Sequence, residues 1–236
     1  MIRNIAFDLG GVVITIDPQQ AKQRFIETGF KNMDSRLNSY TQSGYFGELE
    51  DGTITASDFI AKASAEVGRQ LSFDDCKYCW LGYRKEVPKR NLDKMQALRR
   101  QGYRVIILSN TNPFMMDWAE KGNFDSLGHT LDDYADAVYK SYEMRVMKPS
   151  PLAFRFMLEH EHINAGETLF LDDGKANIDA AATAGSMGIA HASNYKADES
   201  GTRLMYGAVN KAVRCMRKCA PMPADWNAEM EEDAKR

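Results

Sequence analysis

Four short apolar runs, separated by stretches with helical periodicity, constrain the fold of this 236-residue chain more than any other feature. Each run is brief, contains β-branched residues and is apolar on both faces, which is typical of buried parallel strands. The runs are residues 2–7, 103–108, 168–171 and 187–190, with a weaker fifth at 137–139. Strands that alternate with helices predict an α/β fold with a doubly wound parallel sheet.

The segment between the first and second runs interrupts this alternation. Residues 18–88 contain no convincing strand but several amphipathic helical segments, including 21–25, 57–67 and 73–83. A helical insert at this point lies over the carboxyl ends of the strands, where parallel sheets bind ligands. We therefore expect three parts: a core of residues 1–16 and 89–200, a helical cap of residues 17–88, and a C-terminal helix and tail, residues 201–236, on the core.

Composition excludes several classes of function. The net charge is −3 and the pI is near 5.9, so the chain lacks the positive charge that nucleic-acid binding requires. The sequence has no run of about 20 apolar residues to span a membrane, and its start reads into a strand rather than a signal peptide. We expect a cytoplasmic protein without nucleic-acid or membrane partners. The sequence does not indicate an oligomeric state.

The four cysteines form two distant pairs, Cys76 with Cys79 and Cys215 with Cys219, in stretches of helical periodicity. Four thiols in such positions are more typical of reduced cysteines on helices than of a zinc site.

Polar residues stand at the carboxyl ends of the predicted strands and just before one of them. They occur as Asp8-Leu9-Gly10-Gly11 after the first run, Ser109-Asn110-Thr111-Asn112 after the second, Lys148-Pro149 before the third, and Asp172-Asp173 after the third. Because the carboxyl ends of parallel strands meet at one edge of the sheet, these groups are expected to form one site.

The residue types in this set predict phosphoryl transfer. The carboxylate of Asp8, backed by a glycine turn, can attack phosphorus and form an aspartyl-phosphate. The Ser109 hydroxyl, the Asn110 amide and the Lys148 ammonium group can bind the equatorial oxygens of the phosphate. We add Gly11, in the turn behind Asp8, to the candidate phosphate-binding residues.

The acidic residues predict a divalent metal. Asp172 and Asp173, together with Asp8, supply the hard oxygen ligands that Mg²⁺ prefers. Three aspartates at one edge of a sheet repel each other and raise at least one pKa unless cations lie among them. The cluster therefore indicates both a metal and an anion.

The four motifs, in this order, resemble those of the haloacid dehalogenase-like hydrolase superfamily. The likeness covers residues 1–192 and is greatest to the subgroup with a helical cap inserted after the first motif, which includes sugar-phosphate phosphatases. It implies a Rossmann-like core, with Asp8 as the nucleophile, Ser109 as a phosphate-binding residue and Lys148 as the third-motif lysine. For the metal it implies Mg²⁺ bound by Asp8, the main-chain carbonyl of Gly10 and Asp173, with Asp172 acting through water.

Position 10 departs from the pattern of that superfamily. Most of its phosphatases carry a second aspartate two residues after the nucleophile, as general acid and base, and this chain has Gly10 there. A positioned acid contributes about 10²- to 10⁴-fold to a rate. We therefore expect either slow turnover or an unusual proton donor, and the acids of the cap, Glu48, Glu50 and Asp51, are the first candidates.

These observations favour a Mg²⁺-dependent phosphatase that acts on a small phosphorylated metabolite, such as a sugar phosphate. One alternative is a haloacid dehalogenase, which works on carbon without magnesium and typically lacks the acidic pair. The other is a non-catalytic protein of the same fold that binds phosphate or a partner. Retention of Asp8, Lys148 and the acidic pair argues against it, because binding alone needs no nucleophile.

Overall fold

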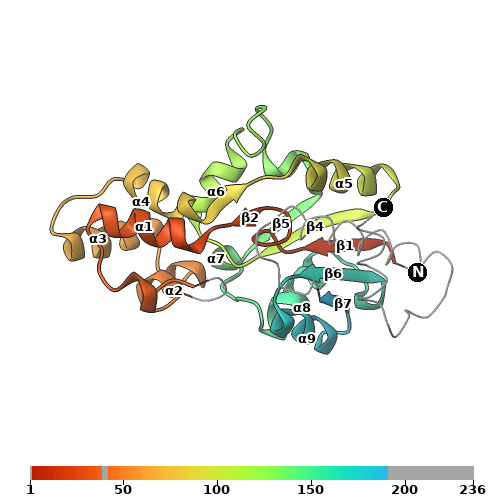
Figure 1. The fold of residues 1–236 in the computed structure, drawn as a ribbon. Coiled ribbons are helices and arrows are strands. Elements are labelled where there is room, and N and C mark those ends of the chain that lie inside the picture. Colours follow the sequence, from red (N-terminus) through yellow and green to blue (C-terminus); the bar gives the residue numbers. More distant parts are fainter. Residues whose placement is uncertain (1, 39–41, 191–236) are drawn as a thin grey trace.

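The computed structural model describes residues 2–38 and 42–190, and a five-stranded parallel sheet forms its centre (Figure 1). The strands pair in the order β5-β4-β1-β6-β7, and every pairing is parallel. Their bounds are Asn4–Phe7 for β1, Arg104–Ser109 for β4, Ala137–Lys140 for β5, Thr168–Asp172 for β6 and Met187–Ala190 for β7. All five predicted runs form strands, and the predicted α/β fold is confirmed.

Helices cover both faces of the sheet (Figure 1). Ile5 and Phe7 of β1 pack in the core that includes helix α5, Lys89–Arg100, and helix α6, Pro113–Glu120. Ala6 points the other way, into the core formed with helix α8, Pro151–His160, and helix α9, Lys175–Thr183. Successive residues of a strand face opposite sides, so apolar residues at every position produce a sheet buried on both faces.

Four helices between β1 and α5 gather beyond the carboxyl end of the sheet (Figure 1). They are α1, Pro18–Thr28; α2, Tyr45–Glu50; α3, Ala56–Val67; and α4, Phe73–Trp80. Their common core is aromatic: the rings of Phe25, Phe46, Phe59 and Trp80 pack with centroids 5.2–5.9 Å apart. Cys76 and Cys79 are buried in α4 with free thiols.

A small two-stranded sheet joins the two connections between the central sheet and these four helices. Strand β2, Thr15–Ile16, pairs antiparallel with β3, Arg84–Glu86. The expectation that residues 18–88 contain no strand is therefore wrong at β3. Three charged residues carry no apolar alternation, and this pairing depends on a partner about 70 positions away in the chain.

Shorter elements complete the described chain. They are α7, Ser141–Met144, and 3₁₀ helices at Met33–Ser35, Leu81–Tyr83, Leu131–Asp133 and Ala165–Glu167. None of the helices in the described ranges is long and apolar enough to cross a membrane. The predicted C-terminal helix and tail, residues 201–236, lie outside the described residues. The predicted limits of core and cap stay a prediction.

Candidate active site

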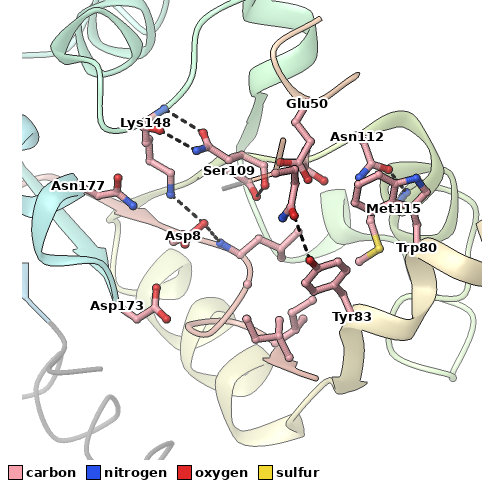
Figure 2. Close-up of a pocket in the computed structure, with 17 residues that line it drawn as sticks. Asp8, Glu50, Trp80, Tyr83, Ser109, Asn112, Met115, Lys148, Asp173 and Asn177 are labelled. Carbon is pink, nitrogen blue, oxygen red and sulfur yellow. Dashed lines mark hydrogen bonds and ion pairs between the residues drawn. The ribbon is translucent and has the colours of Figure 1, made fainter. Parts of the chain in front are cut away.

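The carboxyl ends of three adjacent strands bring the predicted motifs together. Asp8 directly follows β1, Ser109 ends β4, and Asp172 ends β6. Because β1 lies between β4 and β6 in the sheet, these side chains meet at its central edge. Asp8, Ser109, Lys148 and Asp173 all line one pocket between the sheet edge and the segment that holds α1–α4, which we call the cap (Figure 2).

Lys148 links the nucleophile candidate to the acidic pair. Its Nζ lies 2.9 Å from Asp8 Oδ1 and 2.7 Å from Asp172 Oδ2, and its side chain is only 2% exposed. Burial by itself lowers the pKa of Lys148, but the carboxylates of Asp172 and Asp8 outweigh it and raise that pKa. Lys148 is therefore a firmly charged group next to Asp8.

Asn110 holds the backbone of Lys148 in place. Its Nδ2 donates to the Lys148 carbonyl at 2.8 Å, and its Oδ1 accepts from the Lys148 N–H at 2.9 Å (Figure 2). This paired contact fixes the third motif against the second. The side-chain amide of Asn110 thus positions Lys148. The predicted contact of Asn110 with phosphate stays a prediction, and it would use the second N–H of Nδ2.

Asp8 lies in a balance of opposing effects. Burial raises its pKa, the ammonium group of Lys148 lowers it, and the carboxylates of Asp172 and Asp173 raise it further, with a net upward shift. Burial and Asp172 likewise raise the pKa of Asp173. One lysine thus does not neutralise three neighbouring carboxylates, and the remaining negative charge favours binding of a further cation.

The acidic residues fit a magnesium ion, and their hydrogen bonds indicate which of them can bind it directly. Carboxylate oxygens of Asp8, Asp172 and Asp173 lie within 4.8 Å of one another. Asp172 is fully buried and its oxygens are engaged: Oδ2 accepts from Lys148, and Oδ1 accepts from Gly174 N–H at 2.7 Å and Asn177 Nδ2 at 2.8 Å. Hard oxygen donors from Asp8 and Asp173 suit Mg²⁺. Asp172 is better suited to hold Lys148 and to contact the ion indirectly.

Gly11 lies directly against the acidic pair, and its predicted phosphate contact stays a prediction. Its backbone N–H donates to the Ile14 carbonyl at 2.8 Å. Gly11 has a φ of +77°, and a Cβ on it lies 2.5 Å from Asp173 Oδ2. Only glycine leaves space for the Asp173 carboxylate, so Gly11 shapes the metal side of the pocket.

The cap supplies the opposite wall of the pocket. Gln42, Glu50, Trp80 and Tyr83 line it from that side. Glu50 is the last residue of α2 and is only 6% exposed. Burial, only partly offset by a hydrogen bond from the Asn112 side chain, raises the pKa of Glu50 to about 8.

Comparison with known proteins decides the family. A model of haloacid dehalogenase-like hydrolases matches residues 2–185, most of the chain. The chain belongs to the haloacid dehalogenase-like hydrolases. A D-ribitol-5-phosphate phosphatase of Bacteroides thetaiotaomicron is 46% identical over 178 residues, which cover 75% of this chain and 86% of that relative.

Two solved structures resemble this hydrolase closely. A predicted hydrolase of the same family from Porphyromonas gingivalis superposes with a TM-score of 0.81 at 32% identity, covering 91% of this chain and 98% of the other. A family enzyme from B. thetaiotaomicron, crystallised with magnesium and inorganic phosphate, superposes with a TM-score of 0.74 at 30% identity, covering 84% and 98%. The resemblance inferred from the motifs is confirmed.

Within this hydrolase, sequence reasoning located the residues of the sheet edge but assigned no task to several others. Asn112 belongs to the polar run after the second strand but was given no role, and it contacts Glu50; Asn177, which holds Asp172, was not singled out. Glu50 was one of three candidate acids in the cap, and it alone of the three lines the pocket. Glu48 is 41% exposed and lies 3.6 Å from Lys62.

Burial of Glu50 predicts a stability that depends on pH. Its pKa is raised from the ordinary 4.5 to about 8 in the fold, so the folded state binds the extra proton between these two pH values. Stability from this group is therefore full below about pH 4.5 and is lost as the pH rises to 8. Glutamine cannot ionise, so the advantage of Glu50→Gln over the wild type in free energy of unfolding is expected to grow by roughly 3 kcal/mol from pH 5 to pH 8. Urea unfolding at both pH values measures this difference; Glu48→Gln is the control, and an equal difference at both pH values contradicts the assignment.

Proposed function

We propose that this hydrolase is a Mg²⁺-dependent phosphatase that removes phosphate from a small phosphorylated metabolite through an aspartyl-phosphate on Asp8. The observation that carries the proposal is the contact of Lys148 with both Asp8 and Asp172, beside Asp173, at the floor of one pocket. This arrangement places a nucleophile, a fixed cation and a set of metal ligands around a space that a phosphate can enter.

The reaction runs in two displacements. The Asp8 carboxylate oxygen attacks phosphorus, the bond to the substrate oxygen breaks, and the organic product leaves as an alcohol once it gains a proton. Water then attacks phosphorus, the acyl-phosphate bond breaks, and inorganic phosphate leaves while the Asp8 carboxylate is restored. Lys148 binds a phosphate oxygen, and the buried hydroxyl of Ser109, which also lines the pocket, binds another.

Asp8, Asp173 and the Gly10 carbonyl would hold magnesium, which would supply positive charge to neutralise the phosphate. Asp172 keeps Lys148 oriented toward Asp8. The helical cap excludes water from the pocket while the transfer takes place.

The substrate class follows from the relative that hydrolyses D-ribitol 5-phosphate, whose aligned region covers most of both chains. We propose a sugar or polyol phosphate. We also propose a cytoplasmic location, where such metabolites occur, without nucleic-acid or membrane partners. The acidic pair Asp172-Asp173 argues against a haloacid dehalogenase, which needs no metal, and the retained nucleophile argues against a non-catalytic protein.

Release of phosphate from a metabolite panel, with and without magnesium, tests the proposal. We expect turnover of polyol or sugar phosphates that falls at least about 100-fold in excess chelator and returns when Mg²⁺ is added in excess, because the clustered carboxylates need a divalent cation. The control is Mg²⁺ added without prior chelation. Full turnover in chelator contradicts the metal assignment, and absence of turnover with every phosphate contradicts the function.

A further inference from the structure

The pocket extends beyond the nucleophile into a region that the proposed mechanism does not use. Glu50 and Trp80 line this outer region from the cap, and Asn112 lines it from the core (Figure 2). An organic group attached to a phosphate on Asp8 has to extend into this space. Its walls therefore select the substrate.

The charges of the outer pocket disfavour an anionic organic group. Among the described residues that line the pocket, Lys148 is the one lysine or arginine, and two carboxylates already contact it. No second lysine or arginine of this lining is available to pair with a substrate carboxylate or a second phosphate. Glu50 adds an acidic group instead, so the pocket suits an organic part without charge.

Residues of the core, outside helix α2, hold Glu50 in place. Asn112 uses its Oδ1 to accept the N–H groups of Phe114 and Met115 at the start of α6, which directs its NH₂ group to the Glu50 carboxyl. The Ser141 hydroxyl donates to the Glu50 carbonyl at 2.6 Å, and Ser141 Oγ in turn accepts from the Thr111 N–H at 2.9 Å.

A glycine allows the segment after Glu50 to approach the core closely. Gly52 has a φ of +77°, and a Cβ there lies 2.2 Å from the Tyr142 carbonyl oxygen. Cap and core thus contact each other at backbone distance, two residues after Glu50. The carboxyl of Glu50 is pre-positioned at the wall of the pocket before any substrate binds.

Trp80 provides a second, independent sign of a ligand. Its side chain is 1% exposed and lines the pocket, and its Nε1 is buried without a hydrogen-bond partner in the described structure. A buried donor without an acceptor is unfavourable, so a ligand oxygen that accepts from it gains affinity.

The hydrogen-bonding capacity of the two groups matches hydroxyl groups. Burial keeps Glu50 protonated at neutral pH, so its carboxyl both donates and accepts, whereas Trp80 only donates. A hydroxyl also donates and accepts and carries no charge.

We infer that Glu50 and Trp80 form a hydroxyl-binding subsite that restricts the enzyme to phosphate esters of uncharged, polyhydroxylated compounds. The inference deepens the proposed function and rests on it. It makes Glu50 a specificity-determining residue of the cap.

The test compares three substrates: ribitol 5-phosphate, which is neutral apart from its phosphate; 3-phosphoglycerate, which carries a carboxylate; and p-nitrophenyl phosphate, which has no hydroxyl to bind. We expect the wild type to favour ribitol 5-phosphate over 3-phosphoglycerate at least about 100-fold in kcat/KM. Glu50→Leu is expected to lower the ratio of kcat/KM for ribitol 5-phosphate to that for p-nitrophenyl phosphate about 10- to 100-fold, mainly through KM.

Two further variants separate recognition from folding. Glu50→Gln keeps the shape and the contact with Asn112, so its loss is expected to be smaller than that of Glu50→Leu. Glu48→Gln, a half-exposed acid on the same helix outside the pocket lining, is expected to leave the ratio unchanged. A ratio unchanged in Glu50→Leu, or a wild type that prefers 3-phosphoglycerate, overturns the subsite and leaves the phosphatase intact. Absence of wild-type turnover with all three esters overturns both proposals.

Discussion

Replacement of Asp8 with asparagine is expected to lower kcat for every phosphate ester by about 10⁴-fold or more. The amide has nearly the shape of the carboxylate but is a poor nucleophile, so no aspartyl-phosphate forms. Binding of phosphate is expected to persist, because Lys148 stays paired with Asp172 at 2.7 Å. Single-turnover phosphate release and calorimetric titration with inorganic phosphate measure the two effects separately.

The fold is expected to survive this change. The wild-type carboxylate is buried near two others, which raises its pKa, so its removal relieves repulsion as well as losing one contact with Lys148. Asp93→Asn is a matched control, since Asp93 is exposed on α5 and pairs with Lys89 at 2.6 Å. The control should retain full activity. Asp8→Asn turnover within tenfold of the wild type would place the nucleophile elsewhere.

The sheet and its edge were predictable because they depend on local patterns. Buried parallel strands are short apolar runs, and all five runs form strands. Because the strands are parallel, their carboxyl ends share one edge, and Asp8, Ser109 and Asp172 meet there. Such residues are recognisable in the sequence because phosphoryl transfer requires a particular residue type at the end of each of these strands.

Other features depend on contacts that no local pattern encodes. The β2–β3 pairing and the contact between Asn112 and Glu50 join segments far apart in the chain. Glu50 lies in a short helix that also contains Glu48, and in the sequence both are ordinary helix acids. Only the tertiary fold buries one and exposes the other.

Gly10 offers a way to add the missing acid. Its φ lies outside the left-handed region, and a Cβ there meets only Ile16 Cγ2, at 3.4 Å, an ordinary van der Waals contact. An aspartate at this position is therefore sterically admissible two residues after the nucleophile. It supplies a proton to the departing alkoxide and removes one from the attacking water.

We expect Gly10→Asp to raise kcat for ribitol 5-phosphate by about 10²-fold and to change kcat for p-nitrophenyl phosphate little in the transfer step, since that anion leaves unaided. In the wild type the single-turnover rate should rise steeply as the leaving-group pKa falls across a series of esters, and Gly10→Asp should flatten this dependence. Gly10→Asn is the control: it has the same size but transfers no proton, so it should keep the steep slope. A flat slope in the wild type, or an equal gain in Gly10→Asn, would mean that another residue already protonates the leaving group.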